Sequence, residues 1–342
     1  MSLGPLALAS CYHICMSDTK VWAYYRLRKS ILLSPECLGQ SLPVKVLGVS
    51  GTLHMPSVEW NKDNEPYLTP PSFDKDALAQ LKQHNERRLL WGGINSWNPE
   101  EKTFDAFGLS SMLFELDLDT EQITYSDYIY GRGHPIGPQI KMLGGEIDEW
   151  FDELCAWIAA KTKQDLDYRH PLSNVSMPGQ RLQTWTVEGE IVSLIATPNV
   201  IQVSVDRDAA KRALKKDDLA KIITSISDGV RPPENHLFLR DARDASKRGQ
   251  MRKAAIDAGT AVEVTLRNYA ISNSIPIRTQ PPAMLGWYVH NTAPGLPADA
   301  QAKLVDVRND ATHYNAAFNG ALVPDAINIA TQIVESLDPL VL

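Results

Sequence analysis

The sequence predicts an α+β protein in which an N-terminal mixed domain, rich in strands and containing some helices, precedes an all-α helical bundle. Two observations carry this prediction. Stretches of alternating, β-branched residues recur as far as residue 205, whereas helical spacing dominates after residue 230. Between them, Asp228-Gly-Val-Arg-Pro-Pro233 interrupts regular structure. We therefore expect a domain boundary at this point.

The length and charge of the chain limit what it can be. With 342 residues it exceeds one ordinary core, which favours two domains. The net charge of −7 falls on the N-terminal part, because from Arg231 onward 11 basic residues balance 11 acidic ones. This charge argues against a strongly basic DNA-binding protein. Four cysteines form no disulfide framework, and no apolar run approaches the roughly 20 residues of a membrane span. We expect a cytoplasmic protein without a membrane partner.

We expect three parts along the chain. A poorly defined leader over 1–43 is followed by an α+β domain over 44–229 and a helical domain over 230–342. Leu8-Ala-Ser-Cys11 is similar to a lipoprotein cleavage box, but no Lys or Arg precedes it and its apolar stretch is short. Cys11, His13 and Cys15 lack a fourth ligand at a usual spacing, so we predict no metal site there.

The α+β domain is predicted to contain strands and helices in alternation. Strands are expected over 44–54, 111–119, 122–130, 181–187 and 190–205, and helices over 72–89, 147–158 and 207–225. A short turn at 119–121 would join the strands on either side of it. Ser72 suits the N-cap of the first helix.

The C-terminal part predicts four helices, over 235–247, 250–272, 298–314 and 325–337. Gly249 would end the first, and Pro324 suits the first turn of the fourth. Residues 273–297 carry five prolines and two glycines, which indicates a long loop. The sum is a four-helix bundle or a close variant.

The third predicted helix carries the one short group of side chains that suggests a chemistry: Arg308, Asn309 and His313. Histidine moves protons near neutral pH, and arginine holds phosphate. On an ideal helix Asn309 and His313 share a face, whereas Arg308 lies roughly 140° from His313. Either the arginine stem wraps round the helix or a second copy supplies the missing half across a two-fold axis.

Such a cleft would suit RNA cleavage, with an imidazole taking the proton of a ribose 2′-hydroxyl and arginine stabilising the phosphate. The spacing fits a structural alternative equally, in which these side chains only cap the helix end.

The C-terminal segment resembles the HEPN family (higher eukaryotes and prokaryotes nucleotide-binding domains). The family motif is an arginine, a polar residue and, after a short spacer, a histidine, which Arg308, Asn309 and His313 match. The upstream residues 239–263 resemble the hairpin that precedes the motif helix in the family. Glu263 matches an acid near the motif arginine, which implies an orienting role. Some family members carry a tyrosine two residues after the histidine. Here Tyr314 directly follows His313, so we expect it to support the site and not to take part in the chemistry.

This resemblance covers residues 230–340 and implies an all-α, HEPN-like four-helix bundle that dimerises through the motif helix. It also implies a metal-independent endoribonuclease without a cofactor, in bacterial toxin–antitoxin or anti-phage defence. Partners would be RNA and an antitoxin or trigger protein, and the N-terminal domain would sense a trigger or position substrate. The alternatives are a non-catalytic module that binds nucleotide, RNA or protein, and an interaction scaffold.

Basic residues cluster near the start of the bundle and offer a possible path for an RNA backbone. Among them, Arg243, Lys247 and Arg252 are the expected RNA contacts. Asp241 and Asp244 interrupt the run, and the alternative is an ordinary solvated face.

Overall fold

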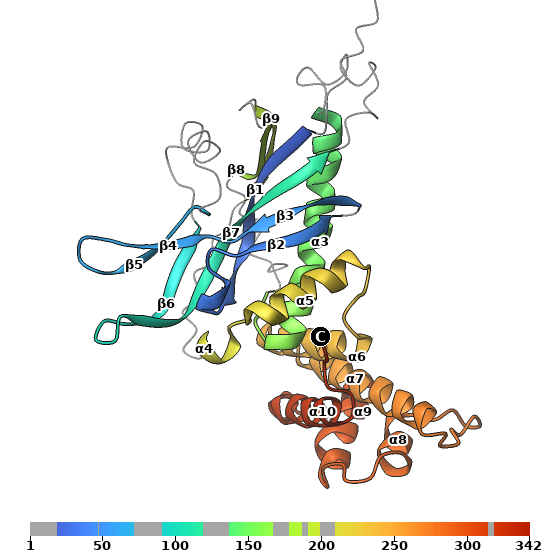
Figure 1. Ribbon diagram of the computed structural model, residues 1–342. Helices are drawn as coiled ribbons and strands as arrows, with labels where there is room; N and C mark the ends of the chain where they lie inside the picture. Colours follow the sequence, from blue (N-terminus) through green and yellow to red (C-terminus); the bar gives the residue numbers. More distant parts are fainter. Residues whose placement is uncertain are drawn as a thin grey trace, which may run out of the picture.

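The computed structural model describes residues 19–46, 48–71, 91–118, 137–166, 178–186, 191–198, 209–313 and 318–342. Within these ranges a strand-rich N-terminal part is followed by a C-terminal group of helices (Figure 1). The predicted α+β class is confirmed at this level.

The N-terminal part is built on a seven-stranded sheet whose described strands all pair antiparallel. Its strand order is β2-β3-β7-β1-β8-β9, and β6 pairs with the first half of β7 on the edge opposite β1. The strands are β1 (Thr19–Leu33), β2 (Ser41–Val46), β3 (Val49–His54), β6 (Gly92–Asn98), β7 (Thr103–Leu118), β8 (Pro178–Thr186) and β9 (Ile191–Pro198). A separate two-stranded sheet joins β4 (Ser57–Trp60) to β5 (Pro66–Thr69).

The predicted leader over 1–43 is wrong from residue 19 onward. β1 occupies the interior of the sheet between β7 and β8, and Tyr25, Ile31 and Leu33 are buried in its core. Arg26 alternates with the buried Tyr25 and Leu27, but the period of two ends where the register against β7 shifts between Arg26 and Ile31, and three consecutive residues from Ile31 are buried. Residues 1–18, including the cleavage-box segment and the cysteines near it, lie outside the described residues.

Of the other predicted strands, some are confirmed and one lies outside the described residues. The predicted strand at 44–54 falls on β2 and β3. The hairpin predicted over 181–205 is confirmed for the described residues 181–186 and 191–198, which belong to the antiparallel pair β8–β9, and residues 199–205 lie outside the described residues. The strand at 111–119 is the second half of β7, which pairs with β1 and β3. Its expected partner at 122–130 and the expected helix at 72–89 lie outside the described residues.

Helix α3 (Gly137–Thr162) covers one face of the sheet, as its apolar spacing predicts (Figure 1). Phe114 and Trp150 meet edge to face with ring centroids 5.4 Å apart, and Tyr25 packs against Phe151 at 5.3 Å. The Tyr25 hydroxyl donates to Asp148 at 2.7 Å. These contacts bury a continuous core between the sheet and α3.

The charged helix predicted over 207–225 is two helices, α4 (Ala209–Arg212) and α5 (Lys216–Ser227). Leu214 lies between them and exchanges backbone hydrogen bonds with β1: its N–H donates to Leu32 O at 3.0 Å, and its carbonyl accepts from Ser34 N–H at 2.9 Å. The backbone of this residue pairs with the sheet, which explains the break in the helix.

The C-terminal unit contains α6 (Glu234–Lys247), α7 (Met251–Ser272), α8 (Leu285–Asn291), α9 (Asp306–Thr312) and α10 (Val323–Leu337). A short 3₁₀ turn, η1 (Pro35–Cys37), precedes β2, and another, η4 (Gly320–Leu322), precedes α10. The predicted helices at 235–247, 250–272 and 325–337 are confirmed as α6, α7 and α10. The predicted loop at 273–297 is wrong in part because it contains α8.

The predicted helix at 298–314 is shorter and less regular than expected. It begins with a π-helical turn, η3 (Gln301–Val305), continues as α9 and ends at Thr312. Tyr314 lies outside the described residues.

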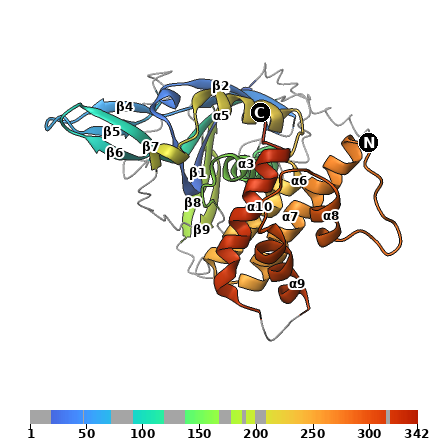
Figure 2. The ribbon, with the colours of Figure 1, turned by 90° about the horizontal axis from the view of Figure 1, so that it is seen from below.

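The buried apolar residues form two large clusters, one that includes residues up to Ile226 and one that begins at Leu239. Helix α3 lies between the sheet and the helical unit and contacts α6 (Figure 2). The chain then returns: Leu340 and Leu342 pack against the N-terminal core, and Asn235 of α6 donates to Asp338 at 2.8 Å. The C-terminal tail therefore ties the helical unit back to the sheet.

Candidate functional site

The candidate site is built on α9 and the face of α7 beneath it. The side chains of α7 that meet other helices are small and apolar. Among them, Ala254, Ala258, Ala261 and Val262 are buried. Gly259 lies on the side facing α9, where a β-carbon would come 2.6 Å from Arg308 Cγ and 3.1 Å from its Cβ. A residue without a side chain at this point lets the stem of Arg308 lie directly on α7.

Arg308 extends from that contact toward an acidic residue on α7. Its side chain is 14% exposed, and its Nη2 lies 3.5 Å from Oε2 of Glu263. The structure thus brings together the motif arginine and the acid that sequence reasoning assigned to it.

The guanidinium of Arg308 is nevertheless under-satisfied. Its Nε is buried without a hydrogen-bond partner, and within the described ranges its side chain makes the ion pair with Glu263 and no hydrogen bond. Guanidinium offers five N–H donors, and burying unpaired donors costs free energy. The site therefore holds an arginine with unused donors, a geometry suited to an oxyanion such as a phosphate.

Asn309 and His313 lie further along the same short helix. Asn309 is half-buried, and its carbonyl accepts from the backbone N–H of His313 at 3.0 Å. His313 is the exposed C-cap residue of α9, with φ −86° and ψ 11°, so its ring leaves from the helix end. No contact joins the imidazole to Arg308 within the described part of one protomer. The structure thus places these residues on one helix without pairing them.

The end of α9 that carries His313 is held by Arg252 of α7. One Nη1 of Arg252 donates to the carbonyls of Asp310 and Ala311, each at 3.2 Å, and its guanidinium lies 4.6 Å from the centroid of the Phe318 ring. These carbonyls are at the helix end, where they have no partner within the helix. Arg252 therefore positions the C-cap by hydrogen bonds and a cation–π contact.

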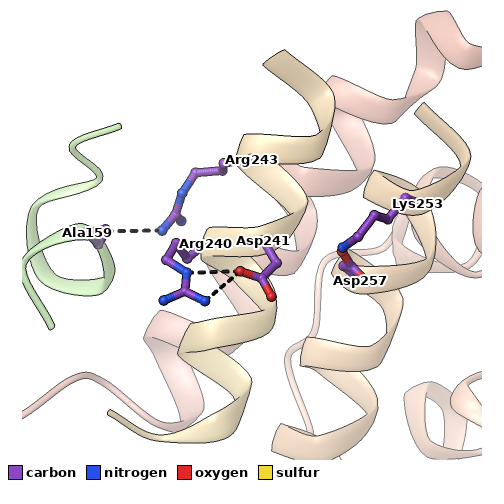
Figure 3. Close-up of polar contacts among 6 residues, drawn as sticks. All are labelled: Ala159, Arg240, Asp241, Arg243, Lys253 and Asp257. Carbon is purple, nitrogen blue, oxygen red and sulfur yellow. Dashed lines mark hydrogen bonds and ion pairs between the residues drawn. The ribbon is translucent and has the colours of Figure 1, made fainter. Parts of the chain in front are cut away.

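The other two expected RNA contacts lie elsewhere. Arg243 of α6 donates to the carbonyl of Ala159 on α3 at 3.5 Å, as Figure 3 shows, and burial lowers its pKa. Nζ of Lys247 lies 3.6 Å from Oδ2 of Asp165, a residue that follows the end of α3. Each of Arg243, Lys247 and Arg252 thus has a partner within the protein, and their contact with RNA stays a prediction.

Sequence reasoning missed the cluster at the start of the motif helix. His290 Nε2 on α8 lies 3.0 Å from Oε1 of Gln301, whose Nε2 donates to Asp306 Oδ1 at 2.7 Å. This cluster spans η3, the π-helical turn, and such turns are frequent at functional sites. No local signal in 298–306 distinguishes a π turn from an α turn, since both satisfy the apolar spacing.

Comparisons with protein-family models, with curated proteins and with solved structures find no match to this chain. In the described ranges, no helix is both long enough and apolar enough to cross a bilayer. The same residues contain no group of three or more His, Cys, Asp or Glu side chains that could hold a metal ion.

Proposed function

We propose that the helical unit is a metal-independent endoribonuclease of the HEPN type, acting in the cytoplasm in bacterial toxin–antitoxin or anti-phage defence. The observation that carries the proposal is the partly buried guanidinium of Arg308, whose Nε has no hydrogen-bond partner and whose Nη2 lies beside Glu263 of α7. The helix that carries Arg308 ends at an exposed histidine, His313. RNA supplies the phosphate that such a guanidinium would bind.

The chemistry requires two proton transfers. The imidazole of one His313 takes the proton of a ribose 2′-hydroxyl while the 2′-oxygen bonds to phosphorus. The bond from phosphorus to the 5′-oxygen breaks, and that oxygen takes a proton from the protonated His313 of a second copy. Arg308 stabilises the charge on the non-bridging oxygens, and Asn309 orients the reacting groups. The products are a 2′,3′-cyclic phosphate and a 5′-hydroxyl.

A homodimer through the motif helix explains why one protomer leaves Arg308 and His313 apart. The exposed residues Ala302, Lys303, Asp306, Thr312 and His313 offer a free face on this helix. A two-fold axis across that face would bring two of each side chain into one cleft. The N-terminal unit, tied to the bundle through α3 and the C-terminal tail, would then sense a trigger or antitoxin, or position substrate.

The test is RNA cleavage by the purified full chain in EDTA. Cleavage with cyclic-phosphate ends is expected. His313→Ala should abolish this cleavage and leave the far-UV circular dichroism spectrum and the melting temperature unchanged. Lys221→Ala is the control, because Lys221 is an exposed residue of α5 outside the helical unit. Cleavage that survives His313→Ala would rule out this mechanism.

A second function is favoured by one observation. Within a protomer Arg308 faces Glu263, not His313, as would suit a module that binds nucleotide, RNA or a partner without cutting. Binding without cleavage, lost in Arg308→Ala, would support that module. A dimer weakened by Arg308→Ala with unchanged RNA affinity would instead indicate a scaffold.

A further inference from the structure

A pocket of about 300 Å³ lies where the two units of the chain meet, away from the motif helix. Its walls come from α3 and the residues after it, from α6 and from the start of α7. The α3 side contributes one acid, Asp152, and an apolar surface that one alanine of α6 extends. The residues of this apolar surface are Cys155, Ala156, Ala159, Leu166 and Ala245. The volume is at the small end of ligand sites in proteins.

The opposite wall contains Asp244, a carboxylate that is only 8% exposed. Among the described residues its side chain has no hydrogen bond or ion pair; its backbone carbonyl alone accepts, from Arg248 N–H at 3.2 Å. Buried carboxylates in proteins are normally paired, because burying one alone is costly. Asp244 is therefore an unfilled acceptor that faces the pocket.

The surrounding charges do not satisfy this carboxylate. Burial raises the pKa of Asp244 to about 6, and Asp165 adds to the increase, against weaker opposing effects from Lys247, Arg240 and Arg243. The aspartate is thus held in a setting that disfavours its charged form.

Three basic residues line the pocket: Arg240, Arg248 and Lys253. Arg248 is exposed, and the other two are engaged with acids. Arg240 donates from Nε and Nη2 to Asp241 Oδ1 at 2.9 and 2.7 Å, and Lys253 is paired with Asp257 (Figure 3). An anionic ligand that paired with Arg240 or Lys253 would have to displace these carboxylates. A cationic ligand would meet the free acceptor of Asp244 without breaking any of these pairs.

We propose that this pocket binds a small organic cation, an amine or guanidine with a short apolar body, whose N–H donors pair with Asp244. The apolar body would lie on the α3 wall between Ala156 and Leu166. Since the walls come from both units, the bound cation would bridge α3 and α6. The proposal is independent of the ribonuclease proposal, because it uses none of the motif residues.

The experiment measures binding of two matched probes to the full chain at pH 7.5 by calorimetry. The probes are n-butylguanidinium and n-butylurea, which have nearly the same shape and differ in charge. Saturation by n-butylguanidinium is expected below about 10 mM, as suits a ligand with few non-hydrogen atoms. The urea should bind at least about tenfold more weakly, because it cannot form the charge-assisted pair.

Two variants decide whether the pocket is the site. Asp244→Asn should weaken n-butylguanidinium about tenfold or more by removing the charge. Ala156→Leu should block binding by filling the pocket from the α3 side, with Asp244 intact. Asp217→Asn is the control, because Asp217 is an exposed carboxylate in the first turn of α5.

Loss of binding in both pocket variants, with the control unchanged, supports the proposal. Absence of saturation by n-butylguanidinium overturns it, as does equal affinity for the two probes. Unchanged affinity in Ala156→Leu and Asp244→Asn also overturns it, since the probe would then bind elsewhere. Should Asp244→Asn fold poorly, Ala156→Leu carries the decision alone.

Discussion

Arg308 on α9 lies directly over Gly259 on α7, so that a β-carbon at position 259 would come within 2.6 Å of the arginine Cγ. This contact sets how closely the motif helix approaches α7. It also directs the guanidinium toward Glu263, one helical turn further along α7. The position of the candidate phosphate-binding group therefore depends on a missing side chain.

Gly259→Ala should push Arg308 away from α7. The steric cost of an extra methyl group in a packed interface is about 1–3 kcal/mol, and the better helix propensity of alanine returns up to about 1 kcal/mol. We expect a net loss in urea unfolding and weaker RNA binding. Gly286→Ala is the control, because its β-carbon would meet Val305 Cγ1 at an ordinary 3.4 Å. Equal stability of the two variants would contradict this account of the contact.

Arg252→Met should loosen the end of α9. It removes the hydrogen bonds to the carbonyls of Asp310 and Ala311 and the contact with Phe318 while keeping an apolar stem. We expect a loss of about 1–3 kcal/mol in the free energy of unfolding. Arg267→Met, at an exposed position on the same helix, should stay within about 0.5 kcal/mol of the parent protein. A similar small effect in both variants would show that Arg252 does not hold the helix end.

Glu263→Gln separates orientation from binding at the proposed ribonuclease site. Without the negative charge, phosphate is less repelled, but Arg308 loses the group that directs it. We expect the single-turnover cleavage rate to fall about tenfold while RNA affinity stays the same or rises. Parallel loss of rate and affinity would indicate that Glu263 contributes to binding instead.

Asp244 predicts a pH-dependent stability. Burial raises the pKa of this carboxyl in the folded chain to about 6, so the folded state holds its proton more tightly than the unfolded state. The contribution of Asp244 to stability therefore falls as pH rises from about 4 to about 6 and stays low above that range.

Asp244→Asn should then stabilise the protein at pH 7 by about 1–2 kcal/mol, after allowance for solvent screening through the pocket, and the gain should vanish near pH 4. Urea unfolding of both proteins across this range measures the difference. A gain that grows toward acidic pH would contradict the assigned direction of the pKa shift.

Much of the secondary structure followed from local pattern. The spacing of Ile147, Trp150, Phe151 and Leu154 identified α3, and β-branched alternation identified β2, β3, β8 and β9. The prediction failed for β1, where Arg26 alternates with the buried Tyr25 and Leu27 but the period of two ends at the register shift against β7, and Ile31, Leu32 and Leu33 are buried in succession. Burial in a sheet depends on the neighbouring strands, which are far away in the chain.

The candidate site divides in the same way. Its residue types and their order, Arg308, Asn309 and His313 with Glu263 upstream, could be read from the chain, because helical spacing is a local property. The burial of the Arg308 guanidinium, its seat on Gly259 and the capping of α9 by Arg252 could not, since each arises where separate helices meet. The unpaired Asp244 in the pocket beside α3 belongs to this second group, because its solvation depends on how two units pack together.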